Sequence, residues 1–392
     1  MSRFLDDLAT RAAERERLGL TRHLVPRHPA TATGTATALT AAETGAEPLD
    51  LAGNDYLGLL RRPDIIAGAV AAAQTYGGGA GASRLVTGTL ALHEELELGL
   101  ARLLQADSAL VFSTGYAANL GAVTALTDAD TLVVSDAHVH ASLIDAARLS
   151  RARVAVVAHN DAAAVERLLA DRSEPRAVVV VESIYSVLGD AAPLADLAAI
   201  TARHDAVLLV DEAHGLGVAG DHGQGLAAAA GISRLDHVVL TVTLSKSLGA
   251  QGGAVLGHPA VREHLVNTAR SFIYDTGLAP ASAGAALAAL RALEHDPSLA
   301  AKVRAHAATL AQACGVEPPA GAVLSVPMPG PHEALAAVET CAGHGIRIGC
   351  FRPPSTPDGI SRLRVTAHAH HTREDVARAA KVLADVTEGG HR

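Results

Sequence analysis

Short apolar runs rich in valine and leucine recur along the chain from residue 109 onward. Most segments between them have the Ala/Leu spacing of helices, as in "APLADLAAITARH" at 192–204. Fully apolar short strands that alternate with helices are typical of a mainly parallel sheet with helices on both faces. The sequence therefore predicts an α/β fold with seven strands at 109–112, 131–135, 154–158, 177–182, 207–211, 237–242 and 253–257.

The pattern changes after about residue 280. An alanine-rich helix is predicted there, followed by separated strands and by a last helix that starts after Thr372, with Glu374 in its first turn. The predicted elements are a helix at 281–296 and strands at 322–328, 345–349 and 362–366. This pattern favours a smaller α+β domain at the C-terminal end.

We expect three parts along the chain. An N-terminal helix and segment should occupy residues 1–45, a large α/β domain residues 46–280, and the smaller domain residues 281–392. The Thr/Ala-rich stretch at 27–48 is expected to form a loop or an edge hairpin.

Composition argues against several classes of partner. The chain has 392 residues, a formal net charge of −9, and 2% aromatic residues with no tryptophan. Nucleic-acid binders need positive surfaces and, for single strands, stacking aromatic rings, so no nucleic-acid partner is expected. The sequence has neither an apolar run of about 18 residues nor a signal-peptide core, so no membrane partner is expected. Three cysteines without a CxxC spacing favour a reduced, cytoplasmic protein.

Polar residues follow most of the apolar runs, at the carboxyl ends where open α/β sheets bind ligands. Lys246 is notable among them because the chain has three lysines against 29 arginines. We expect these residues to form one polar rim: Ser113, Thr114, Gly115, Ser135, Asp136, His138, His140, Glu182, Ser186, Asp211, His214, Thr243, Ser245 and Lys246.

Three motifs suggest other functions but lack the context that these functions need. "DEAH" at 211–214 matches a helicase motif, yet the chain has no Gly-Lys pair and so no GxxxxGK[ST] phosphate loop. "GLGVAG" at 215–220 is a formal GxGxxG, but a loop-like "DHGQG" follows where a dinucleotide-binding oxidoreductase would begin a helix. "AHAHH" at 367–371 has no supporting carboxylate or cysteine spacing, so we expect a solvated turn rather than a metal site.

Lys246 follows an apolar strand and precedes the glycine-rich "SLGAQGG". A lysine at a strand end can simply extend its amine into solvent. Burial, however, lowers the pKa of a lysine and makes it a nucleophile that can form a Schiff base with a carbonyl. Pyridoxal 5'-phosphate (PLP) needs such a lysine, a carboxylate at its pyridine nitrogen and a phosphate cradle. A PLP site on the predicted rim would therefore also need the carboxylate and the phosphate cradle.

Both parts are present on the rim. Asp211 ends the neighbouring strand, and an ion pair near 4 Å at an effective dielectric of about 20 is worth roughly 4 kcal/mol, or about three pK units. The strand-to-helix turn at 113–126 is the phosphate candidate, because helix N-termini present free N–H groups. Thr243 could add a hydroxyl, His140 could stack over the ring, and His214 could bond to the ring hydroxyl.

With these residues in place, the sequence resembles the α-oxoamine synthases, which are PLP enzymes of the aspartate-aminotransferase fold. The resemblance runs from "LAGNDYLGL" at 51–59 to "SRLRVTAHAHH" at 361–371. It also includes "GAGASRLVTGT", "STGYAAN", "HASLIDAA", "VDEAHGLGV" and "TLSKSLGAQGG". It implies a homodimer with shared active sites and PLP bound in the large domain.

The resemblance also implies residue roles. Lys246 would be the Schiff-base lysine and proton carrier, Asp211 the pyridine-nitrogen partner, and His214 the contact to the ring oxygen. His140 would cover the ring and donate a hydrogen bond to a developing oxyanion. The further contacts implied for the cofactor are Gly115, Tyr116, Ser186, Thr243 and, across the dimer, Thr276.

Arg364 matches the arginine that holds the amino-acid carboxylate, and Ser355 matches a substrate-contacting threonine. The family often has arginine directly after the N-terminal Gly-Leu pair; this chain has Thr21 there and Arg22 next, so either could meet the acyl substrate. Leu188 stands where an aspartate is common, so the loop around it could be ordered differently.

Within the family, "AQGGAV" at 250–255 and "FRPPSTPDG" at 351–359 are most similar to members that condense L-alanine with a pimeloyl thioester. The expected reaction releases CO2 and the thiol of either coenzyme A or an acyl carrier protein. Members that use glycine are the alternative, because one methyl group is worth only about 1–3 kcal/mol in a pocket.

Overall fold

The structure is a computed structural model that describes residues 2–18, 21, 24, 48–353, 356 and 358–388. The chain divides into two units, Met1–Pro48 and Leu49–Arg392. The first unit contains helix α1 (Arg3–Arg17), whose first turn is capped by the Ser2 hydroxyl, 3.4 Å from the backbone nitrogen of Leu5. The predicted loop or hairpin at 27–48 lies outside the described residues except at its end.

The second unit is built around a sheet of seven strands in the order β2-β8-β7-β6-β5-β3-β4. β8 alone runs antiparallel, pairing with β2 and β7, and the other neighbouring strands are parallel. The strands are β2 (Ser108–Phe112), β3 (Thr131–Asp136), β4 (Arg153–Val157), β5 (Arg176–Glu182), β6 (Val207–Asp211), β7 (Val238–Thr243) and β8 (Gly253–Gly257). The predicted mainly parallel α/β sheet is therefore confirmed.

Helices cover both faces of this sheet. Successive strand residues point to opposite faces, and accordingly Val178 and Val180 of β5 lie in one apolar cluster whereas Val179 and Val181 lie in another. One face packs against α4 (Gly115–Leu126), α5 (Ala141–Leu149), α9 (Pro259–Thr268) and α10 (Arg270–Ile273). The opposite face packs against α3 (Ala91–Leu103), α6 (Ala162–Ala170), α7 (Leu194–Arg203) and α8 (Leu226–Ala229).

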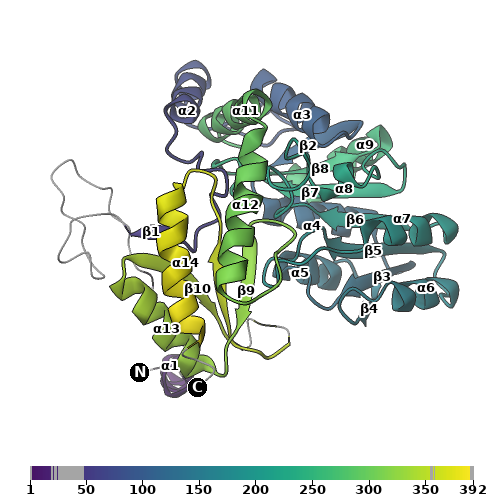
Figure 1. The fold of residues 1–392 in the computed structure, drawn as a ribbon. Helices are drawn as coiled ribbons and strands as arrows, with labels where there is room; N and C mark the ends of the chain where they lie inside the picture. Colours follow the sequence, from purple (N-terminus) through teal and green to yellow (C-terminus); the bar gives the residue numbers. More distant parts are fainter. Residues whose placement is uncertain are drawn as a thin grey trace. The chain divides into compact units, whose positions relative to one another are not determined.

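A smaller sheet has the order β1-β10-β11-β9, with strands β1 (Leu49–Leu51), β10 (Ile346–Phe351), β11 (Arg362–Thr366) and β9 (Val323–Pro327). It carries α12 (Ser298–Ala313), α13 (Pro331–Gly343) and α14 (Arg373–Glu388), which Figure 1 shows to the left of the larger sheet. Strand β1 joins this sheet from far upstream by parallel pairing with β10. The domain boundary expected at residue 280 stays a prediction.

A helix outside the predicted set lies close to a predicted one. Helix α2 (Pro63–Tyr76), like α3, was not predicted, and it packs against α11 (Pro280–His295). A Cβ atom on Gly284 would lie 2.5 Å from both Ala72 Cβ and the carbonyl oxygen of Gly68. Glycine at this crossing therefore allows the two helices to approach closely.

The expectation of a solvated turn at "AHAHH" is wrong, because His368 and His371 are buried. His368 Nδ1 donates to the carbonyl oxygen of Asp55 at 2.7 Å, and Nε2 lies 3.1 Å from Thr366 Oγ1. These contacts tie the segment to a part of the chain some 300 residues upstream, and sequence spacing could not reveal them. In the described parts of the chain, no His, Cys, Asp or Glu group is suited to hold a metal ion.

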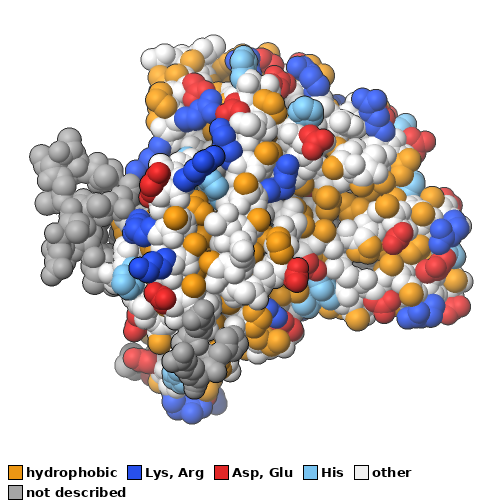
Figure 2. All heavy atoms as spheres, in the orientation of Figure 1, with side chains coloured by type: hydrophobic (Ala, Val, Ile, Leu, Met, Phe, Trp, Pro, Cys, Tyr) orange, Lys and Arg blue, Asp and Glu red, His pale blue; other side chains and the backbone are white. Residues whose placement is uncertain are grey.

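Figure 2 shows acidic and basic side chains interspersed over one face of the molecule. Cys314, Cys341 and Cys350 are all free thiols. Among the described helices, none combines the length and the apolar character needed to cross a membrane.

Candidate active site

A cavity of about 270 Å³ lies at the carboxyl ends of β5, β6 and β7 and beside the starts of α4 and α5. Seven predicted site residues line it: Gly115, Tyr116, His140, Asp211, His214, Thr243 and Lys246. Thr114, Glu182 and Ser245 of the predicted rim also line it, together with Asn119, Ser142, Ala213 and Val242. Segments from residue 114 to residue 246 thus meet around one space.

Other predicted residues do not line this cavity. Ser186 and Arg364 contact each other beside it, and Thr276 is exposed on the surface. Arg22 and Ser355 lie outside the described residues.

The expectation of a single rim is wrong for five of its fourteen predicted members, Ser186 among them. Ser113, Ser135, Asp136, His138 and Ser186 are not among the lining residues. Asp136 instead accepts hydrogen bonds from the turn after β4, near the sheet edge. Ser113 donates a hydrogen bond to Asp275, which does not line the cavity either.

Lys246 is partly buried, and its Nζ atom lies 2.8 Å from Nε2 of His214. Burial of the amine lowers the pKa of Lys246 to about 8, although the carboxylates of Asp211 and Glu182 act in the opposite direction. Both protonation states of the amine are therefore accessible near neutral pH. This is the property that a proton-transferring, imine-forming lysine needs.

His214 links the lysine to a second polar group. Its Nδ1 atom lies 2.8 Å from the hydroxyl of Tyr56, which donates to Oδ1 of Asn54 at 3.0 Å. Burial, and then the positive charge of Lys246, lowers the pKa of His214, so the ring is neutral. The same Asn54 oxygen accepts from Nη2 of Arg364 at 3.2 Å. A continuous chain of hydrogen bonds thus connects Lys246 to Arg364.

Asp211 begins a second chain of hydrogen bonds. Its Oδ2 atom accepts from Nδ2 of Asn119 at 2.8 Å, and the same Nδ2 donates to Ser142 Oγ at 2.9 Å. Ser142 Oγ lies 2.8 Å from Nδ1 of His140, which also accepts the backbone N–H of Ser142. Because Nδ1 accepts, a neutral His140 carries its proton on Nε2. Burial lowers the pKa of His140 and favours this neutral form.

Glu182 lies beside Asp211 in the sheet register and is fully buried. Burial, together with the nearby charge of Asp211, raises the pKa of Glu182 to about 8. Its Oε2 atom accepts the backbone N–H of Ser186 at 2.9 Å. Glu182 is therefore largely protonated near neutral pH.

The start of α4 forms one wall of the cavity. Thr114 caps the helix by accepting the N–H of Ala117 at 3.0 Å. Gly115 lies against Thr243: a Cβ atom at Gly115 would be 2.9 Å from that of Thr243. The first N–H groups of a helix have no partner within it, so this close-packed wall suits an anion such as phosphate.

The donor set fits PLP. One cavity holds an amine of lowered pKa, a carboxylate fixed by hydrogen bonds, two neutral imidazoles and a helix N-terminus with the hydroxyls of Thr243 and Ser245 nearby. The amine suits the carbonyl of PLP, the carboxylate suits its pyridine nitrogen, and the helix N-terminus with the two hydroxyls suits its phosphate.

Four residues that orient the site were not among the predicted site residues: Asn54, Tyr56, Asn119 and Ser142. Asn119 had a detectable signal, since it is a single amide among alanines and leucines in a predicted helix. Tyr56 had a weaker one, as one of five tyrosines in the chain. Asn54 and Ser142 had none apart from their place in the motifs.

Comparisons with known proteins agree with this geometry. The family model of class I and II aminotransferases matches residues 46–383. An 8-amino-7-oxononanoate synthase from Mycolicibacterium gilvum is 58% identical over 339 residues, which cover 86% of this chain and 89% of that protein.

Solved structures agree as well. A serine palmitoyltransferase from S. paucimobilis with bound PLP–myriocin aldimine aligns with a TM-score of 0.86 at 28% identity, covering 98% of each chain. An 8-amino-7-oxononanoate synthase from Francisella tularensis aligns with a TM-score of 0.75 at 25% identity, covering 88% of this chain and 99% of that one. The predicted resemblance, fold and PLP dependence are confirmed. The chain belongs to the aminotransferase class I and II family.

Proposed function

We propose that the chain catalyses the decarboxylative condensation of L-alanine with a pimeloyl thioester. The products are 8-amino-7-oxononanoate, CO2 and a free thiol, in the synthesis of biotin. A relative named for this product is 58% identical over most of the chain. The observation that carries the proposal is the low-pKa amine of Lys246 in the same cavity as the carboxylate of Asp211.

Each part of the cofactor has a proposed partner. Lys246 would hold PLP covalently, Asp211 would face the pyridine nitrogen, and the start of α4 with Thr243 would face the phosphate. His140 would cover the ring, and His214 would face its hydroxyl oxygen. When bound, PLP supplies an electron sink for negative charge at the α-carbon of the substrate.

Lys246 and His140 are the proposed proton-handling residues. Lys246 would take the α-proton of the amino acid and later return a proton to the product, which a pKa of about 8 permits. His140, neutral with its proton on Nε2, would donate a hydrogen bond to the thioester oxygen as negative charge develops there.

Arg364 is the proposed site of the amino-acid carboxylate. Its side chain is buried, and among the described residues it forms no ion pair with a carboxylate. A buried charge without a counter-ion is costly, so an incoming carboxylate would be stabilising. Ser355 and either Arg22 or Thr21 are proposed to meet the rest of the substrates.

We further propose a homodimer with shared active sites, working in the cytoplasm. Thr276 is exposed, and its backbone bridges to Ser83, so its side chain is available to a second copy of the chain. In this arrangement Thr276 would reach the phosphate held by the partner. Thr276→Ala should weaken PLP binding only in the dimer, which equilibrium dialysis at several protein concentrations would detect.

The proposed reaction can be tested directly by mass spectrometry. Purified enzyme with PLP and L-alanine should form 8-amino-7-oxononanoate from pimeloyl-CoA, from a pimeloyl carrier protein, or from both. Lys246→Ala should stay folded, as judged by circular dichroism, and lose turnover. Faster product formation from glycine than from L-alanine would assign a glycine-using reaction instead, and turnover by Lys246→Ala would contradict the role of the lysine.

A further inference from the structure

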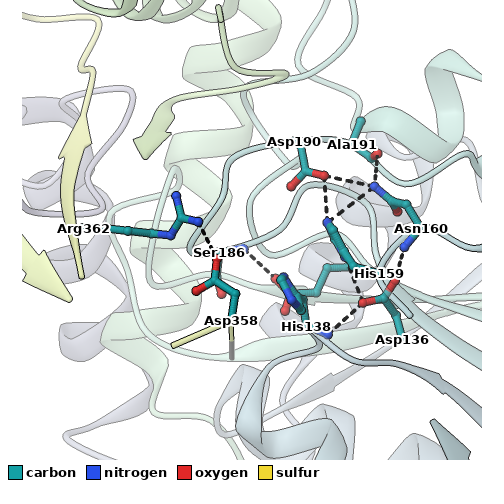
Figure 3. A network of polar contacts seen from close by, with 10 residues as sticks. Asp136, His138, His159, Asn160, Ser186, Asp190, Ala191, Asp358 and Arg362 are labelled. Carbon is teal, nitrogen blue, oxygen red and sulfur yellow. Dashed lines mark hydrogen bonds and ion pairs between the residues drawn. The ribbon is translucent and has the colours of Figure 1, made fainter. Parts of the chain in front are cut away.

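Outside the cavity, His159 is hydrogen-bonded to two carboxylates at once (Figure 3). Its Nδ1 atom lies 3.0 Å from Oδ1 of Asp136, and its Nε2 atom lies 2.8 Å from Oδ2 of Asp190. Carboxylate oxygens only accept, so both ring nitrogens carry protons and the ring is an imidazolium. Burial opposes this charge, but the two carboxylates outweigh burial and raise the pKa of His159 to about 9.

The surroundings hold this ring in place. The ring of His138 stacks on it with centroids 4.2 Å apart and planes 13° apart, and the ring of Tyr185 meets it edge-on at 4.3 Å. Asp136 also accepts the backbone N–H groups of His138 and Asn160, each at 2.7 Å. The imidazolium is therefore fixed to the ends of two neighbouring strands, β3 and β4.

Asp190 belongs to the turn at 183–192, which follows β5. Asn160 Nδ2 donates to Oδ2 of Asp190 at 2.9 Å and to the carbonyl oxygen of Ala191 at 3.1 Å. Within the turn, the backbone N–H of Tyr185 donates to the carbonyl oxygen of Asp190 at 2.9 Å. His159 and Asn160 thus anchor this turn on the large sheet.

The same turn contacts Arg364. The carbonyl oxygen of Ser186 accepts the Nε–H of Arg364 at 2.8 Å, while Nη2 donates to Asn54 at 3.2 Å. The guanidinium group is planar, so these two bonds fix its plane and the direction of its remaining donors. Displacement of the Ser186 carbonyl would turn that plane.

We propose that His159 is a positioning residue for the amino-acid substrate. By bridging Asp136 and Asp190 it holds the turn at 183–192, and through the Ser186 carbonyl it aims Arg364 at the substrate carboxylate. The proposal rests on the carboxylate-binding role proposed above for Arg364.

The test compares two ligands of the PLP-loaded enzyme by the change that each causes in the visible absorption of the cofactor. L-alanine carries a carboxylate, and ethylamine is the same molecule without it. His159→Gln removes the charge and one of the two ring bonds. It should raise the dissociation constant of L-alanine about tenfold and leave that of ethylamine within about twofold.

Two further variants make the test specific. Asp190→Asn changes the partner rather than the histidine and should give the same pattern. His204→Gln is the matched control, because its side chain is 23% exposed against 20% for His159, while its Nε2 atom is 3.9 Å from Glu166 and forms no hydrogen bond with the turn. It should bind both ligands as the unmodified enzyme does.

A double variant tests the route through Arg364. In the Arg364→Ala background, His159→Gln should cause no additional loss of L-alanine binding. An equal loss for both ligands, an additive loss in the double variant, or unchanged L-alanine binding by His159→Gln would each overturn the proposal. If the unmodified enzyme with PLP failed to respond to L-alanine, the proposed function itself would fail, and the two failures are therefore distinguishable.

Discussion

Lys246 donates a hydrogen bond to His214, with 2.8 Å between Nζ and Nε2. Below about pH 8 the amine is an ammonium group without a lone pair, so Nε2 has to accept and carries no proton. The neutral ring therefore has its proton on Nδ1 and donates it to the Tyr56 hydroxyl at 2.8 Å. Tyr56, which forms no hydrogen bond to the lysine, thus selects the tautomer of the histidine that does.

We expect Tyr56→Phe to lower the pKa of Lys246 by about half a unit to one unit. Without the tyrosine oxygen, the Nδ1 proton of His214 has no acceptor, and the tautomer with the proton on Nε2 becomes competitive. That tautomer cannot accept from an ammonium group, so the charged lysine is destabilised. Competitive acetylation of the enzyme without PLP, followed by mass spectrometry at a series of pH values, would measure this pKa.

The chain provides internal references for this measurement. Its two other lysines, Lys302 and Lys381, are exposed, so their labelling in every variant monitors the reactivity of the reagent. Tyr185→Phe is the matched control, because Tyr185 is as deeply buried as Tyr56 but packs against His159. An unchanged Lys246 pKa in Tyr56→Phe would show that Tyr56 does not set the tautomer.

Asp211→Asn should retain PLP and slow exchange of the α-proton of L-alanine at least about a hundredfold. The carboxylate is expected to keep the pyridine nitrogen protonated, because the ion pair between them raises the pKa of that nitrogen by roughly three units. A neutral amide cannot do so. Proton NMR in deuterated water, without any thioester, would follow the exchange. Exchange at the original rate with PLP still bound would argue that Asp211 has no electrostatic role.

Most of the large sheet could be predicted from the sequence, because a strand buried on both faces has to be apolar throughout. The run at 177–182 illustrates this, since its residues from Ala177 to Val181 alternate between two apolar clusters and leave no polar position before Glu182. Strand β1 could not be predicted, because its three residues are defined only by pairing with β10, some 300 positions away.

The candidate site likewise contains residues that could be predicted from the sequence and residues that could not. Lys246, Asp211 and His214 were predictable because their chemistry and their places after apolar strands point to one function. His159 was not, because its two carboxylate partners lie 23 and 31 positions from it and no local pattern marks them. The prediction for Asp136 was wrong for the same reason. Its position at the end of a strand places it at the carboxyl edge of the sheet, but does not tell which residues its side chain contacts.

Ser142→Ala should reduce kcat about tenfold while PLP stays bound. The hydroxyl lies between Asn119 and His140, at 2.9 Å and 2.8 Å, and helps to keep Nδ1 of His140 an acceptor. The backbone N–H of residue 142 would remain as a weaker partner, so a complete loss is not expected. Steady-state kinetics with L-alanine and the thioester would measure the change. A kcat within about twofold of the original would assign the orientation of His140 to the backbone alone.

The bridge formed by His159 also predicts a pH dependence of stability. The folded pKa of about 9 lies above the ordinary value of about 6.5, so the stabilisation is complete below about pH 6.5 and is lost as the pH rises through about 9. The full difference between the two pKa values corresponds to roughly 3 kcal/mol in the free energy of unfolding. Solvent screening of the partly exposed ring reduces this contribution to about 1–2 kcal/mol.

The groups that face the His159 ring do not reverse the direction of this pH dependence of stability. The pKa of Asp136 is lowered by its bonds to His159 and to backbone N–H groups, although burial acts against them, so it stays charged. Burial lowers the pKa of His138 and raises that of Tyr185, so both stay neutral over this range. Thermal unfolding followed by circular dichroism should therefore place Tm of the unmodified protein above that of His159→Gln at pH 6.5. The gap should close by pH 10, whereas an equal gap at both pH values would mean that packing of the ring, rather than its charge, stabilises the fold.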